Sequence, residues 1–242
     1  MLYSQTVDRY MLNPALPLTE LAAHTLEDAP VNNQRVPQGR KAVISSEELI
    51  AAALKLVGPH RSISTLSLRE VAREAGIAPN SFYRHFRDID ELAVSLIELA
   101  GASLRKVLSE ARQRASNERS VVQSSIEVFM EQLSIGEGFL PILLREGKVG
   151  SAAFKEAVER QLCFFEDELQ QDLVRLGLAN GHSLHQPALA ARAITRLVFA
   201  MASVSMDLPT PEQQQKMAET ITMIRMILEG ARVMATQELV QN

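Results

Sequence analysis

The stretch Ser67–Phe86 constrains the fold of this chain more than any other part of the sequence. Ser67 and Glu70 have the spacing of a capping box, in which each side chain accepts a hydrogen bond from a backbone N–H at the start of a helix. Gly76 predicts the end of that helix, because glycine readily adopts the left-handed backbone that stops a helix. Pro79 then predicts the first turn of a second helix. Two helices joined by a short turn are the pattern of a helix-turn-helix.

The second of these helices is predicted to place a polar surface next to two buried rings. Phe82 and Phe86 lie one turn apart and define its inner face. The residues left to point elsewhere are Asn80, Ser81, Tyr83, Arg84 and His85. Asn and Ser near a helix N-terminus can reach base edges in a major groove, whereas Tyr, Arg and His can donate to phosphate oxygens. The alternative is an ordinary helical hairpin with a solvated polar face.

We therefore predict that this surface binds double-stranded DNA. Base reading is assigned to Asn80 and Ser81, with help from Arg69 in the preceding helix. The residues assigned to phosphate contact are Ser67, Tyr83, Arg84 and His85. Arg40 and Lys41 end a proline-containing N-terminal tail, and such basic arms enter an adjacent minor groove or lie along phosphates. A merely disordered leader is the alternative for the tail.

The run from Leu66 through Leu92 closely resembles the DNA-binding domain of TetR-family transcriptional repressors. The segments that carry the resemblance are Val71-Ala72, Ala75-Gly76-Ile77, Phe82-Tyr83-Arg84-His85-Phe86 and Asp90-Glu91-Leu92. The amino-acid sequence from Ser67 to Asp88 most resembles that of the bacterial repressors of unsaturated fatty acid synthesis. The resemblance implies a long-chain acyl effector such as acyl-CoA. Many members have a Lys at the start of the fourth helix, where this chain has Ile89, so that phosphate contact is not expected here.

The rest of the sequence predicts helices and no strand. Capping boxes at Ser45 with Glu48 and at Asp88 with Glu91 introduce a helix on each side of the helix-turn-helix. The later helices are expected at about 120–134, 139–147, 151–176, 187–207 and 211–237. The predicted fold is all-α, with three helices in the helix-turn-helix domain and six in the larger one. The expected divisions are an irregular tail at 1–40 with a possible short helix at 18–26, a DNA-binding domain at 41–88, and a ligand-binding and dimerisation domain at 89–242.

The charge of the chain is divided in a way that suits DNA binding. The formal net charge is −4, but the balance is −3 for residues 1–34, +2 for 35–92 and −3 for the remainder. Only the segment that holds the helix-turn-helix is positive. Phosphate contact is therefore expected to be confined to that segment.

The larger domain is predicted to hold an apolar pocket and a dimer interface. Helical ligand domains place their sites between helices lined by Phe, Leu and Met, although most such residues are core. The candidate ligand residues are Phe129, Leu133, Phe139, Leu143, Arg145 and Phe164. Within the acyl resemblance, Arg145 and Lys148 are the candidates for an acidic headgroup, and a surface or salt-bridging role is the alternative for each. The last two helices look too apolar for one core, so we expect a homodimer through them, matching a palindromic operator.

The sequence favours neither an enzyme nor a metal-binding protein. Cys163 lies in an apolar helix without a His at helical spacing, so a buried core thiol is expected rather than a nucleophile. His182 and His185 lack a nearby acidic or sulfur partner in sequence, which favours solvated loop histidines over a metal pair. His60 and Arg61 are likewise expected to be solvated. No catalytic residue, metal or cofactor is predicted. We expect no stretch that is long and apolar enough to span a bilayer, and we expect a cytoplasmic location.

The sequence thus predicts a DNA-binding transcriptional regulator that acts as a repressor of fatty acid or lipid metabolism genes and is modulated by a long-chain acyl ligand. One alternative is a regulator of efflux or catabolic genes that senses another hydrophobic compound. From other classes, a helical interaction module or an enzyme with a degenerate DNA-binding domain stays open.

Overall fold

The computed structural model describes residues 44–57, 61–113, 118–134 and 139–241, with side chains described for 44–57, 61–113, 121–133 and 140–238. Within these ranges every regular element is a helix. The elements are α3 (Ser46–Val57), the 3-10 helix η1 (Ile63–Thr65), α4 (Leu68–Glu74), α5 (Pro79–Phe82), α6 (Ile89–Gln113), α7 (Glu118–Ser134), α8 (Phe139–Val149), α9 (Ala152–Ala179), α10 (Pro187–Ser205) and α11 (Thr210–Gln241). The all-α prediction is confirmed, and each of the nine predicted helices has its counterpart in the described ranges. The short helix expected at 18–26 lies outside them.

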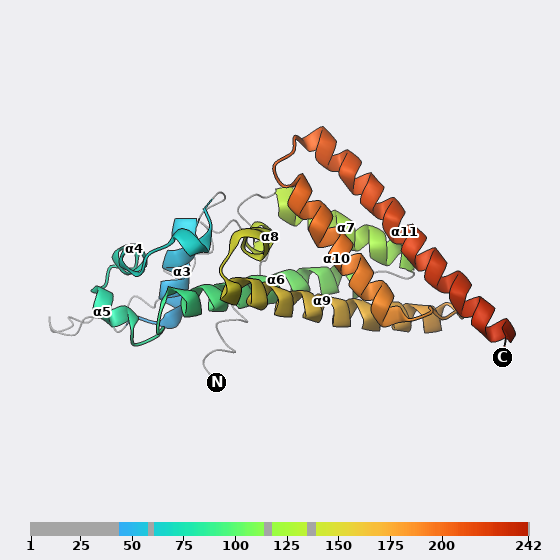
Figure 1. Ribbon diagram of the computed structural model, residues 1–242, viewed down its shortest axis with the longest axis horizontal. Coiled ribbons are helices and arrows are strands. Elements are labelled where there is room, and N and C mark those ends of the chain that lie inside the picture. The colour runs from blue at the N-terminus through green and yellow to red at the C-terminus, as the bar shows by residue number, and fades with distance from the viewer. Residues whose placement is uncertain (1–43, 58–60, 114–117, 135–138, 242) are drawn as a thin grey trace, which may run out of the picture.

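Helices α3, α4 and α5 form a small unit at one end of the molecule (Figure 1). Its centre is apolar, since Leu49, Ala53, Val71 and Phe82 are fully buried. The predicted capping box at the start of α3 is present: Ser45 N donates to Glu48 Oε2 at 2.7 Å and Glu48 N donates to Ser45 Oγ at 3.2 Å.

The larger part of the molecule is built on α6 and α9, which run side by side along its length (Figure 1). Helix α6 starts in the small unit, packs against α3 and continues into the body, so one rigid element belongs to both parts. Helices α7, α10 and α11 lie toward the far end, and α8 lies near the small unit (Figure 1). Ile89, at the start of α6, packs against the core, which is why an apolar residue suits that position.

Two sequence expectations in the body are wrong. Cys163 is exposed, not buried, because it lies on the outer side of α9. Helix α10 is long and apolar enough to span a membrane by length and composition alone, with a mean hydropathy of 1.4. However, α10 packs on α9 and α11, and its Arg192 and Arg196 pair with the buried Glu166 of α9. One face of α10 therefore packs into the helical body.

Candidate DNA interface and ligand cavity

The turn between α4 and α5 has the local geometry that its residues predict. Gly76 has φ +68°, and a Cβ there would meet no other atom, so the glycine is required by backbone conformation and not by space. Pro79 occupies the first turn of α5. Regular helix ends at Phe82, and the chain continues through tight turns in which Phe86 N still bonds to Phe82 O at 3.2 Å. The second helix is therefore shorter than predicted, but Phe82 and Phe86 are both buried as expected.

Most of the predicted DNA-contacting side chains are accessible. Arg69, Asn80, Tyr83 and Arg84 are exposed, and Tyr83 is 60% exposed although it is aromatic. An exposed Tyr beside an exposed Arg is suited to phosphate contact. Ser81 is half-buried, which leaves it partly reachable at the start of α5.

Two further residues assigned to phosphate contact, His85 and Ser67, are limited by burial or by existing hydrogen bonds. His85 is half-buried and its Nε2 is buried without a hydrogen bond, so a phosphate contact would have to use Nδ1. Ser67 uses both its N–H and its hydroxyl on Glu70, and a phosphate would compete with that carboxylate. Arg40 and Lys41 lie outside the described residues. The DNA contacts assigned to all nine residues stay predictions.

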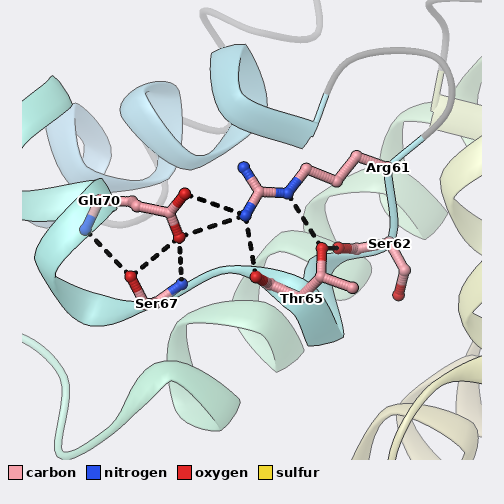
Figure 2. Close-up of polar contacts among 5 residues, drawn as sticks. All are labelled: Arg61, Ser62, Thr65, Ser67 and Glu70. Atoms are coloured by element: carbon pink, nitrogen blue, oxygen red, sulfur yellow. Dashed lines mark hydrogen bonds and ion pairs between the residues drawn. The ribbon is translucent and has the colours of Figure 1, made fainter.

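A polar network, of which the sequence predicted only the capping box, holds the start of α4 (Figure 2). Ser67 and Glu70 form the predicted capping box, with Ser67 N donating to Glu70 Oε2 at 3.0 Å and Glu70 N donating to Ser67 Oγ at 3.3 Å. Arg61 adds a salt bridge to Glu70 at 3.1 Å and donates to Thr65 O at 2.8 Å. The bonds from Ser67 and then Arg61 lower the pKa of Glu70 below its usual value, which keeps it ionised. Arg61 is thus structural, and the expectation that it is simply solvated is wrong.

The body contains an apolar cavity at its far end, between α6, α7, α9, α10 and α11. Its volume is about 70 Å³. The lining residues are Leu108, Arg112, Val121, Val122, Ser125, Ile126, Phe129, Phe165, Leu169, Leu173, Ile194, Thr195, Val198, Phe199 and Ile224. Phe129 meets Phe199 edge to face, with ring centroids 5.4 Å apart, and these two rings form part of the wall.

Of the six candidate ligand residues, only Phe129 lines this cavity. Leu133 and Leu143 are buried in the neighbouring core, and the side chain of Phe139 lies outside those described. Arg145 does not line this cavity, and its Nη1 donates to Arg61 O at 2.7 Å.

Phe164 lies outside the cavity as well. It is 48% exposed, and Arg105 stacks on its ring at 4.8 Å. The wall residue is its neighbour, Phe165. Helical periodicity along α9 does not show which of Phe164 and Phe165 faces the cavity, because that depends on where the neighbouring helices lie.

One ionic side chain, Arg112, is among the lining residues, and it is already neutralised. Its side chain is 4% exposed, with Nε 2.6 Å from Asp172 Oδ2 and Nη2 3.1 Å from Glu168 Oε2. Ser125 Oγ, also in the wall, is buried without a hydrogen-bond partner. The cavity can therefore accept apolar groups and offer at most a hydroxyl to a polar one.

Metal binding finds no support in the residues that the structure describes. Among them, no three His, Cys, Asp or Glu side chains are grouped so that they could hold an ion. His185 instead pairs through Nδ1 with Glu238 Oε1 at 2.9 Å and ties the loop before α10 to α11.

A capped helix-turn-helix with exposed polar residues on its second helix, joined to a helical body with an internal cavity, defines a DNA-binding transcriptional regulator. Comparison with known proteins gives the family. Residues 49–96 match the model of the bacterial regulatory proteins of the tetR family. An uncharacterized HTH-type transcriptional regulator of Haemophilus influenzae is 37% identical over 190 residues, which cover 78% of this chain and 91% of that protein. The chain belongs to the TetR family, and it is accordingly a transcriptional regulator and not an enzyme.

Solved structures share this fold at low sequence identity. A transcriptional regulator from Rhodococcus sp. RHA1 matches with a TM-score of 0.62 and 19% identity, over 78% of this chain and 98% of that one. E. coli NemR in its reduced form matches with a TM-score of 0.60 and 20% identity, over 74% and 94%. FadR from Bacillus subtilis, in complex with stearoyl-CoA, matches with a TM-score of 0.59 and 14% identity, over 77% and 99%.

Proposed function

We propose that this chain is a homodimeric repressor in the cytoplasm, with a DNA-binding domain at 41–88 that occupies a palindromic operator and a ligand and dimerisation domain at 89–242. Its DNA affinity is set by a long-chain acyl ligand, such as an acyl-CoA, whose chain enters the cavity. The apolar cavity, which is lined by residues of five helices of the body and by none of the helix-turn-helix, is the observation that carries this proposal. The similarity in fold to FadR, which was solved with stearoyl-CoA, supports the acyl class of ligand.

The chemistry of the wall narrows the ligand. A free fatty acid would bring a carboxylate, but Arg112 is occupied by two acidic side chains inside the cavity wall. Burying another anion there would cost several kcal/mol unless it displaced one of them. An acyl chain whose polar end stays outside, as in a thioester of a large carrier, avoids this cost. We therefore favour an acyl thioester over a free acid.

The size of the cavity implies that binding changes the protein. At about 70 Å³ it is smaller than an engineered cavity of roughly 150 Å³ that binds benzene. A long acyl chain must therefore push wall side chains aside, among them Phe129 and Phe199. Because packed cores respond to such changes by shifting between discrete arrangements, the ligand would alter how the helices sit.

The outer faces of α10 and α11 support the dimer. The exposed apolar residues on these helices include Leu189, Val204, Met226, Val233 and Met234. Gly230 lies on the exposed side of α11, and a Cβ there would meet nothing within the protomer. A glycine inside a helix is unfavourable unless something requires the space, and a closely approaching second copy would do so.

The test is fluorescence anisotropy of the purified protein on the intergenic DNA upstream of its own gene. Stearoyl-CoA and oleoyl-CoA should change the DNA affinity, whereas CoA without an acyl chain should not. Tight DNA binding that no acyl-CoA alters would support the role as a repressor and refute the acyl ligand. A response to a different hydrophobic compound would establish the efflux or catabolic alternative.

Two neighbouring serines provide a matched pair of variants for the cavity. Ser125 lines the cavity, whereas Ser124, also half-buried on α7, does not. Ser125→Leu should fill the cavity and abolish the acyl-CoA response while DNA binding persists. Ser124→Leu should respond like the original protein. Equal responses from the two variants would place the ligand elsewhere.

A further inference from the structure

Glu146 of α8 is a completely buried acid that points out of the body toward the small unit. Its Oε1 accepts a hydrogen bond from Ile63 N at 2.9 Å, and its Oε2 accepts one from Ser62 Oγ at 3.1 Å. Next to it, Arg145 Nη1 donates to Arg61 O at 2.7 Å. Two consecutive residues of α8 therefore hold three consecutive residues at the start of η1.

This contact has little freedom to adjust. Ile63 is fully buried, so withdrawal of Glu146 would leave its N–H without its hydrogen-bond acceptor inside the core. Gly150 closes the other side, because a Cβ there would lie 2.5 Å from Glu146 O and 2.8 Å from Phe154 Cβ. A buried carboxylate that receives charge-assisted hydrogen bonds is held strongly in one geometry. Helix α8 and η1 must therefore move together or separate.

The same segment continues into the DNA-binding helices. Arg61, whose carbonyl is held by Arg145, uses its side chain to bind Thr65 and Glu70 (Figure 2). Glu70 closes the capping box at the start of α4, and α4 packs on α5. A continuous series of hydrogen bonds thus runs from α8 to the first turn of the helix-turn-helix.

On its other side, α8 shares a core with the cavity. Phe129 and Phe199 line the cavity and belong to the same buried cluster as Leu140 and Leu143 of α8. A ligand that displaces the two rings changes the packing under α8. Helix α8 therefore lies between the cavity and η1, with apolar contacts on one side and hydrogen bonds on the other.

We propose that Glu146 is the positioning residue that couples the cavity to the orientation of the helix-turn-helix. This inference rests on the proposed function and specifies how the ligand acts. A shift of α8 carries η1 and α4 with it through Glu146, which changes the separation of the two recognition helices in a dimer. Since half-sites on DNA lie at fixed helical spacing, a small displacement lowers the affinity for one spacing relative to others.

The first readout needs no ligand. In Glu146→Ala the amide of Ile63 should exchange with solvent roughly tenfold faster or more, because its hydrogen bond to a charged acceptor is lost. Binding to palindromes whose half-sites are moved apart by one or two base pairs should also become less selective. Val149→Ala, a change at an exposed residue of the same helix, should alter neither. Unchanged exchange and unchanged spacing preference in Glu146→Ala would overturn the proposal.

The second readout uses stearoyl-CoA. Glu146→Ala should still bind stearoyl-CoA in calorimetry but no longer change its DNA affinity, whereas Glu146→Gln, which keeps an oxygen for Ile63 N, should regain part of the response. A full response in Glu146→Ala would refute the coupling and leave the proposed function intact. If no acyl-CoA changes the DNA affinity of the unaltered protein, the proposed function is wrong. The two ligand-free measurements then test the role of Glu146 by themselves. Ser62→Ala serves if Glu146→Ala does not fold. It removes one of the two hydrogen bonds to Glu146, together with the bonds between Ser62 Oγ and Ser64, and it should show the same changes to a smaller extent.

Discussion

Replacing Arg112 by Met would test whether the ionic contacts in the cavity wall stabilise the fold. Arg112 is almost fully buried and holds Asp172 at 2.6 Å and Glu168 at 3.1 Å. Removing one partner of a buried ion pair typically costs about 3–5 kcal/mol, because an uncompensated charge stays inside. The cost should be smaller here, since Asp172 keeps Arg175 at 3.1 Å and Glu168 keeps Arg105 at 3.3 Å.

We expect Arg112→Met to lower the free energy of unfolding by about 2–3 kcal/mol, because methionine also fills part of the lost volume. For a chain of this size that corresponds to a decrease in melting temperature of roughly 5–10 °C. Urea unfolding followed by circular dichroism, at one fixed protein concentration, measures the change. The matched control is Arg175→Met, which removes an exposed partner of the same acid and should cost less than about 1 kcal/mol.

The double variant Arg112→Met with Asp172→Leu tests the cause. If the buried unpaired acid is responsible, the second change should restore part of the stability. Equal costs for Arg112→Met and Arg175→Met would refute the reasoning. The acyl-CoA response should persist in Arg112→Met, since the proposed ligand keeps its polar end outside; its loss would point to an anionic group bound by Arg112.

Three further outcomes follow from the structure. Asn80→Ala should cost about 1–3 kcal/mol at one base position and relax specificity there, whereas Arg84→Ala should weaken binding to all sequences and reduce the salt dependence; equal losses of Asn80→Ala on operator and random DNA would contradict base reading. Gly230→Leu should convert the dimer to a monomer in sedimentation equilibrium, and an unaltered dimer would place the interface elsewhere. Ser67→Ala should lower stability by about 1 kcal/mol at neutral pH. Because the folded-state pKa of Glu70 lies below its usual 4.5, its stabilising contribution is complete above that pH and is lost as the pH falls through the lower value, so Ser67→Ala should weaken this acid dependence in pH-dependent melting.

The features that the sequence determined are those governed by neighbours in the chain. The capping box of Ser67 and Glu70, the left-handed Gly76 and the helix start at Pro79 all depend on residues within a few positions of one another. The burial of Phe82 follows from helical periodicity, and Phe86 is buried one turn later. The same periodicity predicted the helices found in the described ranges and, approximately, most of their ends. Local rules therefore sufficed for the fold class and for the surface proposed to contact DNA.

The tertiary structure alone decided which distant residues meet. Glu146 contacts Ile63, and Arg112 contacts Asp172, across separations in sequence that no periodic pattern encodes. Periodicity indicates that a residue lies on a buried face, but the identity of its partner depends on how the helices cross, and this is set by packing throughout the core. For the same reason the sequence alone could not show which apolar residues surround the cavity and which only fill the core beside it.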